Sequence, residues 1–268
     1  MTEDIARFTT ITLERIETGI CLVRLNRPER LNAMNLAMPE DFERLCAVLW
    51  RDDSVRVLII TGNGKGFCSG ADLVDAADEK NLPYFADPQT FLASVQERYS
   101  ALITGLRDIP QPVIAAVNGA AAGGGFCMAL ASDIRVATPE ACFIASFVNI
   151  GLSGGELGSS YLLPRLVGLA HAAEILYTGR KVDAQEAERV GLVNAVVPKE
   201  RLLEKALDYA RTMLAKSPGG LRQTKRVLDR NIDAPCLETA MEVENRNQAL
   251  LVFSGDFARM VKSFKDRP

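Results

Sequence analysis

Two short apolar segments each run into a glycine-rich turn, and this repeated pattern constrains the fold more than any other feature of the sequence. Residues 55–61 lead into the turn at 62–70, and residues 113–117 lead into the turn at 119–125. Apolar runs of this length predict buried strands, and strands that alternate with helical segments predict parallel pairs in a sheet. Glycines after such strands allow backbone N–H groups to face a ligand. We therefore expect an α/β fold with a binding site at these turns.

The two turns allow a functional and a purely structural interpretation. If they converge, two backbone N–H groups would hold one oxygen atom, which is the geometry of an oxyanion hole. The alternative is that they are ordinary glycine-rich connections between strands and helices.

Other glycine-containing motifs do not match this sequence in their spacing or residues. Gly62, Gly64 and Gly66 do not have the spacing of a dinucleotide-binding turn, and Lys65 is not followed by Ser or Thr as in a P-loop. Cys68 lacks a recognisable base for a nucleophilic role.

The remaining segments divide the chain at Pro198. Residues 1–197 alternate strands and helices, which predicts an α/β core, whereas residues 198–268 contain helices only. The polar residues 74–90 predict a mobile segment that shapes the substrate pocket. The predicted strands are 11–17, 20–26, 55–61, 113–117, 134–137 and 192–197, and the predicted helices are 39–50, 91–106, 126–131, 156–178, 184–190, 201–215, 218–231, 236–252 and 255–264.

Composition excludes several classes of protein. The 31 basic and 34 acidic residues give a net charge of −3, which argues against nucleic-acid binding through bulk charge. The single histidine, His171, lies in a predicted helix, and we expect it on the helix surface. The six cysteines lack the C-x-x-C spacing of a zinc site, so we expect no metal. No apolar run approaches the roughly 18 residues of a membrane span. With the acidic residues near the N-terminus, these features lead us to expect a cytoplasmic protein with reduced thiols and no membrane partner.

Motifs at the glycine-rich turns resemble those of a known family. Gly66-Phe-Cys-Ser-Gly-Ala-Asp-Leu73 resembles the A-F-(C/S)-A-G-A-D-L signature of the crotonase superfamily, the enoyl-CoA hydratase/isomerase family. Val117-Asn-Gly-Ala-Ala-Ala-Gly-Gly-Gly125 is similar to the V-N-G-x-A-x-G-G-G motif of that family. Further segments match in the same order over residues 10–268, among them Leu25-Asn-Arg-Pro-Glu-Arg-Leu-Asn-Ala33. Each matching segment alone is weak evidence for the family, but the full set in this order is specific for it.

The resemblance implies a fold, an assembly and a ligand. The fold would be α/β, with a crotonase-like spiral core of repeated ββα units over residues 1–197 and a helical trimerisation region over residues 198–268. The assembly would be a homotrimer or a homohexamer. The substrate would be an acyl-CoA thioester, and no cofactor would be needed because CoA is part of the substrate.

The resemblance also implies roles for particular residues. The backbone N–H groups of Ala71 and Gly124 would form the oxyanion hole for the thioester carbonyl, in agreement with the functional interpretation of the two turns. Other positions would contact the acyl group or the CoA, although each arginine among them is as readily explained as a surface charge. These positions are Arg27, Arg30, Ser69, Gly70, Asp72, Leu73, Cys127, Phe147, Phe264 and Lys265.

The sequence departs from the family where catalytic carboxylates are expected. Well-known hydratases carry one Glu two residues after the Gly-Gly-Gly run and a second Glu twenty residues later. Here these positions hold Cys127 and Phe147. Glu156 remains as the candidate acid and base, because its glycine-rich segment resembles the A-A-D-V-G stretch of dienoyl-CoA isomerases. The alternative is an ordinary Glu near the start of a helix.

These residues predict an enzyme acting on an acyl-CoA thioester. Hydration of a 2-enoyl-CoA, through an enolate held in the oxyanion hole, is the first hypothesis because it is typical of the family. A double-bond isomerase of enoyl- or dienoyl-CoA is the second, because one carboxylate such as Glu156 can move a proton between two carbons. A CoA-thioester hydrolase and a non-catalytic acyl-CoA-binding protein are the remaining alternatives.

Overall fold

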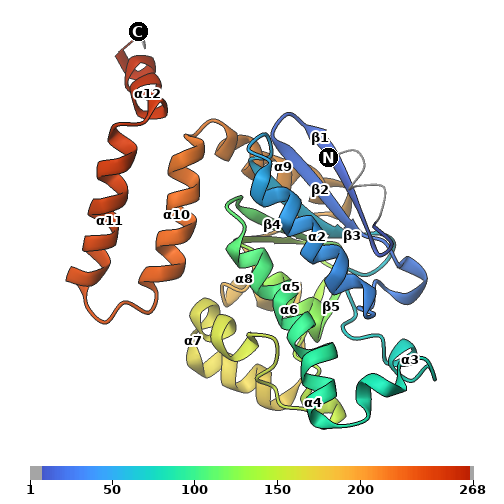
Figure 1. Ribbon diagram of the computed structural model, residues 1–268. Coiled ribbons are helices and arrows are strands. Elements are labelled where there is room, and N and C mark those ends of the chain that lie inside the picture. Colours follow the sequence, from blue (N-terminus) through green and yellow to red (C-terminus); the bar gives the residue numbers. More distant parts are fainter. Residues whose placement is uncertain (1–7, 266–268) are drawn as a thin grey trace.

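A six-stranded sheet forms the centre of the protein (Figure 1). The computed structural model describes residues 8–265, with side chains described up to residue 262. The sheet order is β1-β2-β3-β4-β6-β9; β1 and β2, predicted as strands over 11–17 and 20–26, form an antiparallel hairpin, and the other neighbours are parallel. The strands are β1 Ile11–Glu17, β2 Ile20–Leu25, β3 Val57–Gly62, β4 Val113–Val117, β6 Ile134–Ala137 and β9 Ala195–Val196.

Helices cover both faces of this sheet because its central strands are apolar on both faces. Along β3, Leu58 and Ile60 belong to one hydrophobic cluster, whereas Val57 and Ile59 belong to another. This division follows from the alternation of side chains along a strand. Several helices contribute to the first cluster and one contributes to the second, which fixes the sheet between them. The first group includes α2 Ala37–Arg51, α5 Glu97–Asp108 and α6 Gly124–Ala131, and the helix of the second cluster is α9 Leu202–Leu214.

A second, three-stranded sheet, which the sequence analysis did not predict, includes part of the second glycine-rich turn. Its strands are β5 Ala120–Ala122, β7 Cys142–Ile144 and β8 Lys181–Asp183; β5 and β7 are parallel, and β7 and β8 are antiparallel. Strands of three residues are too short to display an alternating pattern. A bridge between Cys68 and Ala121 attaches the first turn to β5, so the two turns lie side by side.

Residues 74–90, predicted to be a mobile segment, belong to a stretch before α5 that folds into a series of short helical turns. These are α3 Leu73–Ala76, the 3-10 turn Leu82–Phe85, α4 Pro88–Phe91 and the π-helical turn Leu92–Gln96. The carboxylates of Asp72 and Asp87 cap α3 and α4, accepting hydrogen bonds from the N–H groups of Asp75 and Gln89 at 3.1 and 2.9 Å. Such caps stabilise helices too short to persist alone.

Two further helices, one before β8 and one after it in the chain, pack in the core. α7 Ser159–Thr178 begins later than residue 156, so Glu156 lies in the loop before the helix rather than in its first turn. His171 is exposed on α7, as predicted. α8 Ala184–Arg189 begins after Asp183, whose carboxylate accepts a hydrogen bond from the Glu186 N–H at 2.8 Å. The cap lies at the start of the helix that the sequence predicted over residues 184–190.

The last three helices form an arm that extends from the body of the molecule (Figure 1). α10 Pro218–Asn231 and α11 Leu237–Val252 pack side by side, and α12 Gly255–Lys265 follows. By contrast, α9 packs on the sheet although it also follows Pro198. The division into domains at residue 197 stays a prediction. The arm carries exposed apolar side chains, namely Leu228, Ile232, Leu237, Met241, Leu250, Val252, Phe253 and Phe257.

None of the helices among the described residues has the length and apolar character that a membrane span requires.

Candidate active site

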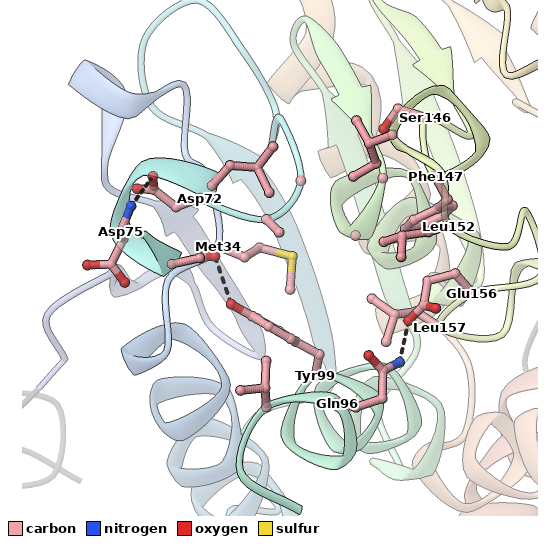
Figure 2. A pocket seen from close by; sticks show the side chains of 18 of the residues that line it. Met34, Asp72, Asp75, Gln96, Tyr99, Ser146, Phe147, Leu152, Glu156 and Leu157 are labelled. Carbon is pink, nitrogen blue, oxygen red and sulfur yellow. Dashed lines mark hydrogen bonds between the residues drawn. The ribbon is translucent and has the colours of Figure 1, made fainter. Parts of the chain in front are cut away.

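A mostly apolar cavity of about 250 Å³ opens beside the two glycine-rich turns (Figure 2). One part of its wall comes from the segments 69–73 and 122–125, which we call the donor turns; in the second of them, Gly123 and Gly124 line the cavity. Another part comes from the segment 151–158, which we call the Glu156 loop and which contributes Leu152, Glu156 and Leu157. The helical segment that contains Gln96 and Tyr99 forms a third part.

The donor turns are pressed together by close backbone contacts. Gly70 has φ +92°, and a Cβ placed there would lie 2.9 Å from the carbonyl oxygen of Ala122. A Cβ on Gly125 would lie 2.2 Å from the carbonyl oxygen of Cys68. Side chains at these two positions would force the turns apart. The glycines therefore permit the convergence that the sequence pattern predicted.

The N–H group of Ala71 is free to bind a ligand. Ala71 is paired with Met34 as in a parallel sheet. Met34 uses its N–H to donate to the Gly70 carbonyl at 2.7 Å, and its own carbonyl accepts from the Asp72 N–H at 2.9 Å. In this pattern, the residue between the two bonds directs its N–H away from its partner. Ala71 lines the cavity, and its N–H donates to no other described residue.

Gly124 supplies a second free donor because it is the first residue of α6. The first N–H groups of a helix have no partner inside the helix, and that of Gly124 has none elsewhere among residues 8–265. The N-terminal end of a helix also favours negative charge. A Cβ on Gly124 would lie 2.6 Å from the Met34 sulfur. Ala71 and Gly124 thus both adjoin Met34 and line one cavity, and their role as a shared oxyanion hole stays a prediction.

The backbone of Glu156 is fixed on both sides. Its N–H donates to the Ser159 hydroxyl at 3.0 Å. Its carbonyl accepts from the Ser159 N–H at 2.8 Å and from the Cys127 thiol at 3.4 Å. The next residue, Leu157, has φ +45°, a left-handed conformation that is unfavourable for a side chain of this kind. Such strain is found at functional sites that hold a group in one place.

The side chain of Glu156 lines the cavity and meets one polar partner. Gln96 donates a hydrogen bond from its amide nitrogen to Oε1 of Glu156 across the cavity wall (Figure 2). Two other carboxylates line the described cavity, but each lies near a cation: Asp72 is paired with arginines, and Asp75 is 3.7 Å from Lys80. Among the described residues, Glu156 is therefore the cavity carboxylate with no ion pair.

Asp72 joins the first donor turn to the loop after β2. Its carboxylate accepts hydrogen bonds from Arg30 at 2.8 Å and from Arg27 at 2.9 Å. These bonds, with that from Arg30 the strongest cause, hold the pKa of the Asp72 carboxyl well below its usual range. Arg27 and Arg30 are thus engaged behind the cavity wall. Arg30 nevertheless keeps 35% of its side chain exposed.

Cys127 and Phe147, which occupy the positions of the two usual glutamates, differ in their exposure to the cavity. Phe147 lines it. Cys127 is completely buried and lies behind Glu156, outside the described lining. Burial, assisted by the nearby charge of Glu156, raises the pKa of the Cys127 thiol well above its ordinary value. The thiol therefore stays protonated and cannot replace a carboxylate base.

The structure brings most of the predicted site residues to one cavity. Arg27, Arg30 and Cys127 lie just behind its wall. Phe264 and Lys265 belong to α12, but their side chains fall outside the described part of the chain. The predicted residues that line the cavity are Ser69, Gly70, Ala71, Asp72, Leu73, Gly124, Phe147 and Glu156.

The sequence analysis did not identify Met34, Gln96 or Tyr99 as site residues. The Tyr99 hydroxyl donates to the Met34 carbonyl at 2.9 Å, and burial raises its pKa. Tyr99 belongs to an apolar stripe that includes Val95, but a stripe predicts only a buried face, not a cavity. Gln96 carries no such signal. Within residues 8–265, no cluster of three or more His, Cys, Asp or Glu side chains is placed to hold a metal ion.

Comparisons with known proteins agree with this architecture. The family model for enoyl-CoA hydratase/isomerase matches residues 15–267. A probable enoyl-CoA hydratase of Mycobacterium bovis is 44% identical over 238 residues, covering 89% of this chain and 83% of that protein. A crystal structure of a probable enoyl-CoA hydratase/isomerase from Mycobacterium abscessus has a TM-score of 0.87 and 40% identity, covering 96% of each chain. A structure described as a monofunctional enoyl-CoA isomerase from Mycobacterium smegmatis has a TM-score of 0.73 and 44% identity, covering 87% of this chain and 98% of that one.

The fold is that of the crotonase superfamily, as the sequence motifs implied. More narrowly, the chain belongs to the enoyl-CoA hydratase/isomerase family, and it is an enzyme of the hydratase/isomerase type. The predictions of an α/β crotonase-like fold, of the family and of an enzyme are thereby confirmed. An acyl-CoA thioester substrate is consistent with this family. The names of the relatives include both hydratases and isomerases, so the reaction has to be inferred from the site.

Proposed function

We propose that this enzyme moves a carbon–carbon double bond along the acyl chain of an enoyl-CoA thioester, with Glu156 as acid and base. The observation that carries this proposal is the presence of one cavity carboxylate without an ion pair among the described residues. Isomerisation takes a proton from one carbon and returns it to another. One carboxylate can perform both steps.

The reaction starts when the thioester oxygen is held by the N–H groups of Ala71 and Gly124. These donors stabilise the negative charge that develops on this oxygen. In a 3-enoyl-CoA, the Glu156 carboxylate then takes a proton from C2, and the electrons of the broken C–H bond pass into a dienolate. Glu156 returns the proton to C4, and the double bond lies between C2 and C3. The atoms balance without water, and we propose no cofactor beyond the CoA of the substrate.

Hydration of a 2-enoyl-CoA is the second candidate, and the 44% identity to a probable enoyl-CoA hydratase favours it. Hydration requires one group to activate water and one group to protonate C2. Cys127 is buried and protonated, and Phe147 is apolar, so neither assists Glu156. Because hydration lacks this second group, we rank it after isomerisation, whereas from the sequence alone hydration is the first hypothesis.

The two reactions are distinguished by the absorbance of the conjugated enoyl thioester. Isomerisation of a 3-enoyl-CoA creates this absorbance, whereas hydration of a 2-enoyl-CoA removes it. We expect turnover with the 3-enoyl substrate, and a loss of about 10²- to 10⁴-fold in Glu156→Gln, because the amide cannot act as a base. Glu140→Gln, at an exposed turn, is the matched control. Wild-type turnover in Glu156→Gln would refute the role of Glu156, and hydration without isomerisation would refute the reaction.

We also propose that the enzyme assembles as a homotrimer or a homohexamer through its C-terminal arm. The exposed apolar side chains of the arm, such as Leu237 and Phe253, support this assembly, because large exposed apolar patches mark interaction sites. Sedimentation equilibrium of the full chain tests it, with a monomer at all concentrations as the contrary result. For the CoA, we propose contacts from Arg27 and Arg30 to the phosphates and from Phe264 and Lys265 at the end of the arm.

We propose the cytoplasm as the location of the enzyme. All six cysteines are free thiols, and five of them are buried. Free thiols are typical of a reducing compartment. Fractionation of cells that express the full chain tests this location, with enzyme in a secreted or membrane fraction as the contrary result.

A further inference from the structure

Gln96 is a polar residue in a part of the cavity wall that is otherwise apolar. Phe91 and Val95 lie beside it on the same helical segment, and all three line the cavity. The amide of Gln96 donates to Oε1 of Glu156, which is 60 positions further along the chain. Figure 2 shows the two side chains meeting at the cavity edge. Because this half-buried amide donates a hydrogen bond to the candidate base, it can influence how that base acts in the reaction.

A local distortion of the helix brings Gln96 to this position. The residues Leu92–Gln96 form a π-helical turn between α4 and α5. Such a turn contains more residues than an α-helical turn, so it changes which side chains face a given direction, and it occurs frequently at functional sites. Here Val95 is 3% exposed, and Gln96 and Tyr99 both line the cavity. The π-helical turn, which is rarer than regular α-helix, thus ends at the residue that contacts Glu156.

We propose that Gln96 is the positioning residue for Glu156, and this proposal rests on the acid–base role of Glu156 proposed above. The backbone of Glu156 is already fixed by Ser159 and Cys127. The remaining freedom lies in the side-chain torsions. The Gln96 hydrogen bond restricts them and occupies Oε1, so that Oε2 is the oxygen left to exchange the proton. Gln96 itself does not touch the reacting atoms.

The first test replaces Gln96 by a residue of similar size without a donor. In Gln96→Leu, we expect kcat for isomerisation to fall about 10- to 100-fold, because a misplaced catalytic group has effects of this order. KM and the midpoint of thermal unfolding should stay close to those of the wild type. Gln89→Leu is the matched control, because Gln89 is exposed on α4. If Gln96→Leu does not fold, Gln96→Asn keeps the polarity but shortens the reach, and the same fall in kcat is expected.

The second test replaces the amide donor of Gln96 by a carboxyl group. In Gln96→Glu, two carboxylates face each other, and like charges at this distance cannot both ionise freely. We expect kcat to be lowest at high pH and to recover as the pH falls, because one protonated carboxyl can donate to the other. The wild type should not show this recovery. A merely structural role for Gln96 would lower stability in the variants and leave the shape of the pH profile unchanged.

The outcomes separate this proposal from the proposed function. If Glu156→Gln is inactive but Gln96→Leu and Gln96→Glu keep the wild-type kcat and pH profile, the positioning role is wrong and the acid–base role stands. If Glu156→Gln keeps wild-type turnover, both are wrong. If the positioning role is correct, Gln96→Leu lowers kcat in the wild type but causes no further fall in the Glu156→Gln background, because the two residues act as one unit.

Discussion

The donor turns and the Glu156 loop line the same cavity but are built in different ways. The donor turns meet through backbone contacts that depend on the absence of side chains at Gly70 and Gly125, while the Asp72 carboxylate joins the first turn to the loop after β2. The Glu156 loop is held by side chains, with contacts from Ser159, Cys127 and Gln96. The part that we propose to hold an oxygen is thus defined by the main chain. The part that we propose to move protons depends on specific side chains from distant segments, so substitutions change it more easily.

The strongest test of this difference removes one main-chain donor. Proline has no N–H but is tolerated at the first position of a helix, which is where Gly124 lies. We expect Gly124→Pro to lower kcat about 10²- to 10³-fold, as the loss of one oxyanion donor does. Gly124→Ala adds a Cβ against the Met34 sulfur but keeps the N–H, so it isolates the donor from the steric effect. Equal kcat in the two variants would contradict the proposal that the Gly124 N–H is an oxyanion donor.

The next test concerns the stability of the first donor turn. We expect Asp72→Asn to lower the free energy of unfolding by about 1.5–3 kcal/mol at pH 7, because a neutral amide replaces the buried carboxylate that pairs with the partly exposed Arg27 and Arg30. The low pKa of Asp72 in the native state means that its contribution is complete above an unfolded pKa of about 3.9 and is lost as the pH falls further. Urea unfolding at pH 7 and at pH 3 measures this difference.

The exposed pair between Asp53 and Arg222 supplies the control for this test. Asp53→Asn should change the stability by less than about 1 kcal/mol, as expected for an exposed pair. A difference between Asp72→Asn and the wild type that does not shrink at low pH would show that the carboxylate charge does not hold the donor turn.

The smallest effect is expected at the support of Glu156. Cys127→Ala removes the weak hydrogen bond from the thiol to the Glu156 carbonyl, and we expect kcat to fall less than tenfold, because a hydrogen bond contributes about 0.5–1.5 kcal/mol. Cys127→Ser keeps a donor and should retain more of the activity. Steady-state kcat and KM for both variants check this. A loss as large as that of Gly124→Pro would mean that the two parts of the site are equally sensitive.

The same difference explains how much of the molecule could be predicted from the sequence. Glycines that permit close approach are visible as a pattern, so the donor turns and the long strands β3 and β4 were predictable. The three-residue strands β5, β7 and β8 were not, because they are too short to show a period. The pairing of Gln96 with Glu156 depends on a π-helical turn and on the tertiary fold. Neither leaves a signal in a single sequence.

The main-chain origin of the two donors also has a consequence for how such a site can evolve. A change of side chain leaves the N–H of Ala71 in place, and only proline removes it. Under the proposed mechanism, mutations around Glu156 can therefore alter which carbon receives a proton while the main-chain donors for the carbonyl oxygen are kept. A lineage that starts from this scaffold can explore new reactions without first losing the old means of binding, which makes the fold a durable source of catalytic variety.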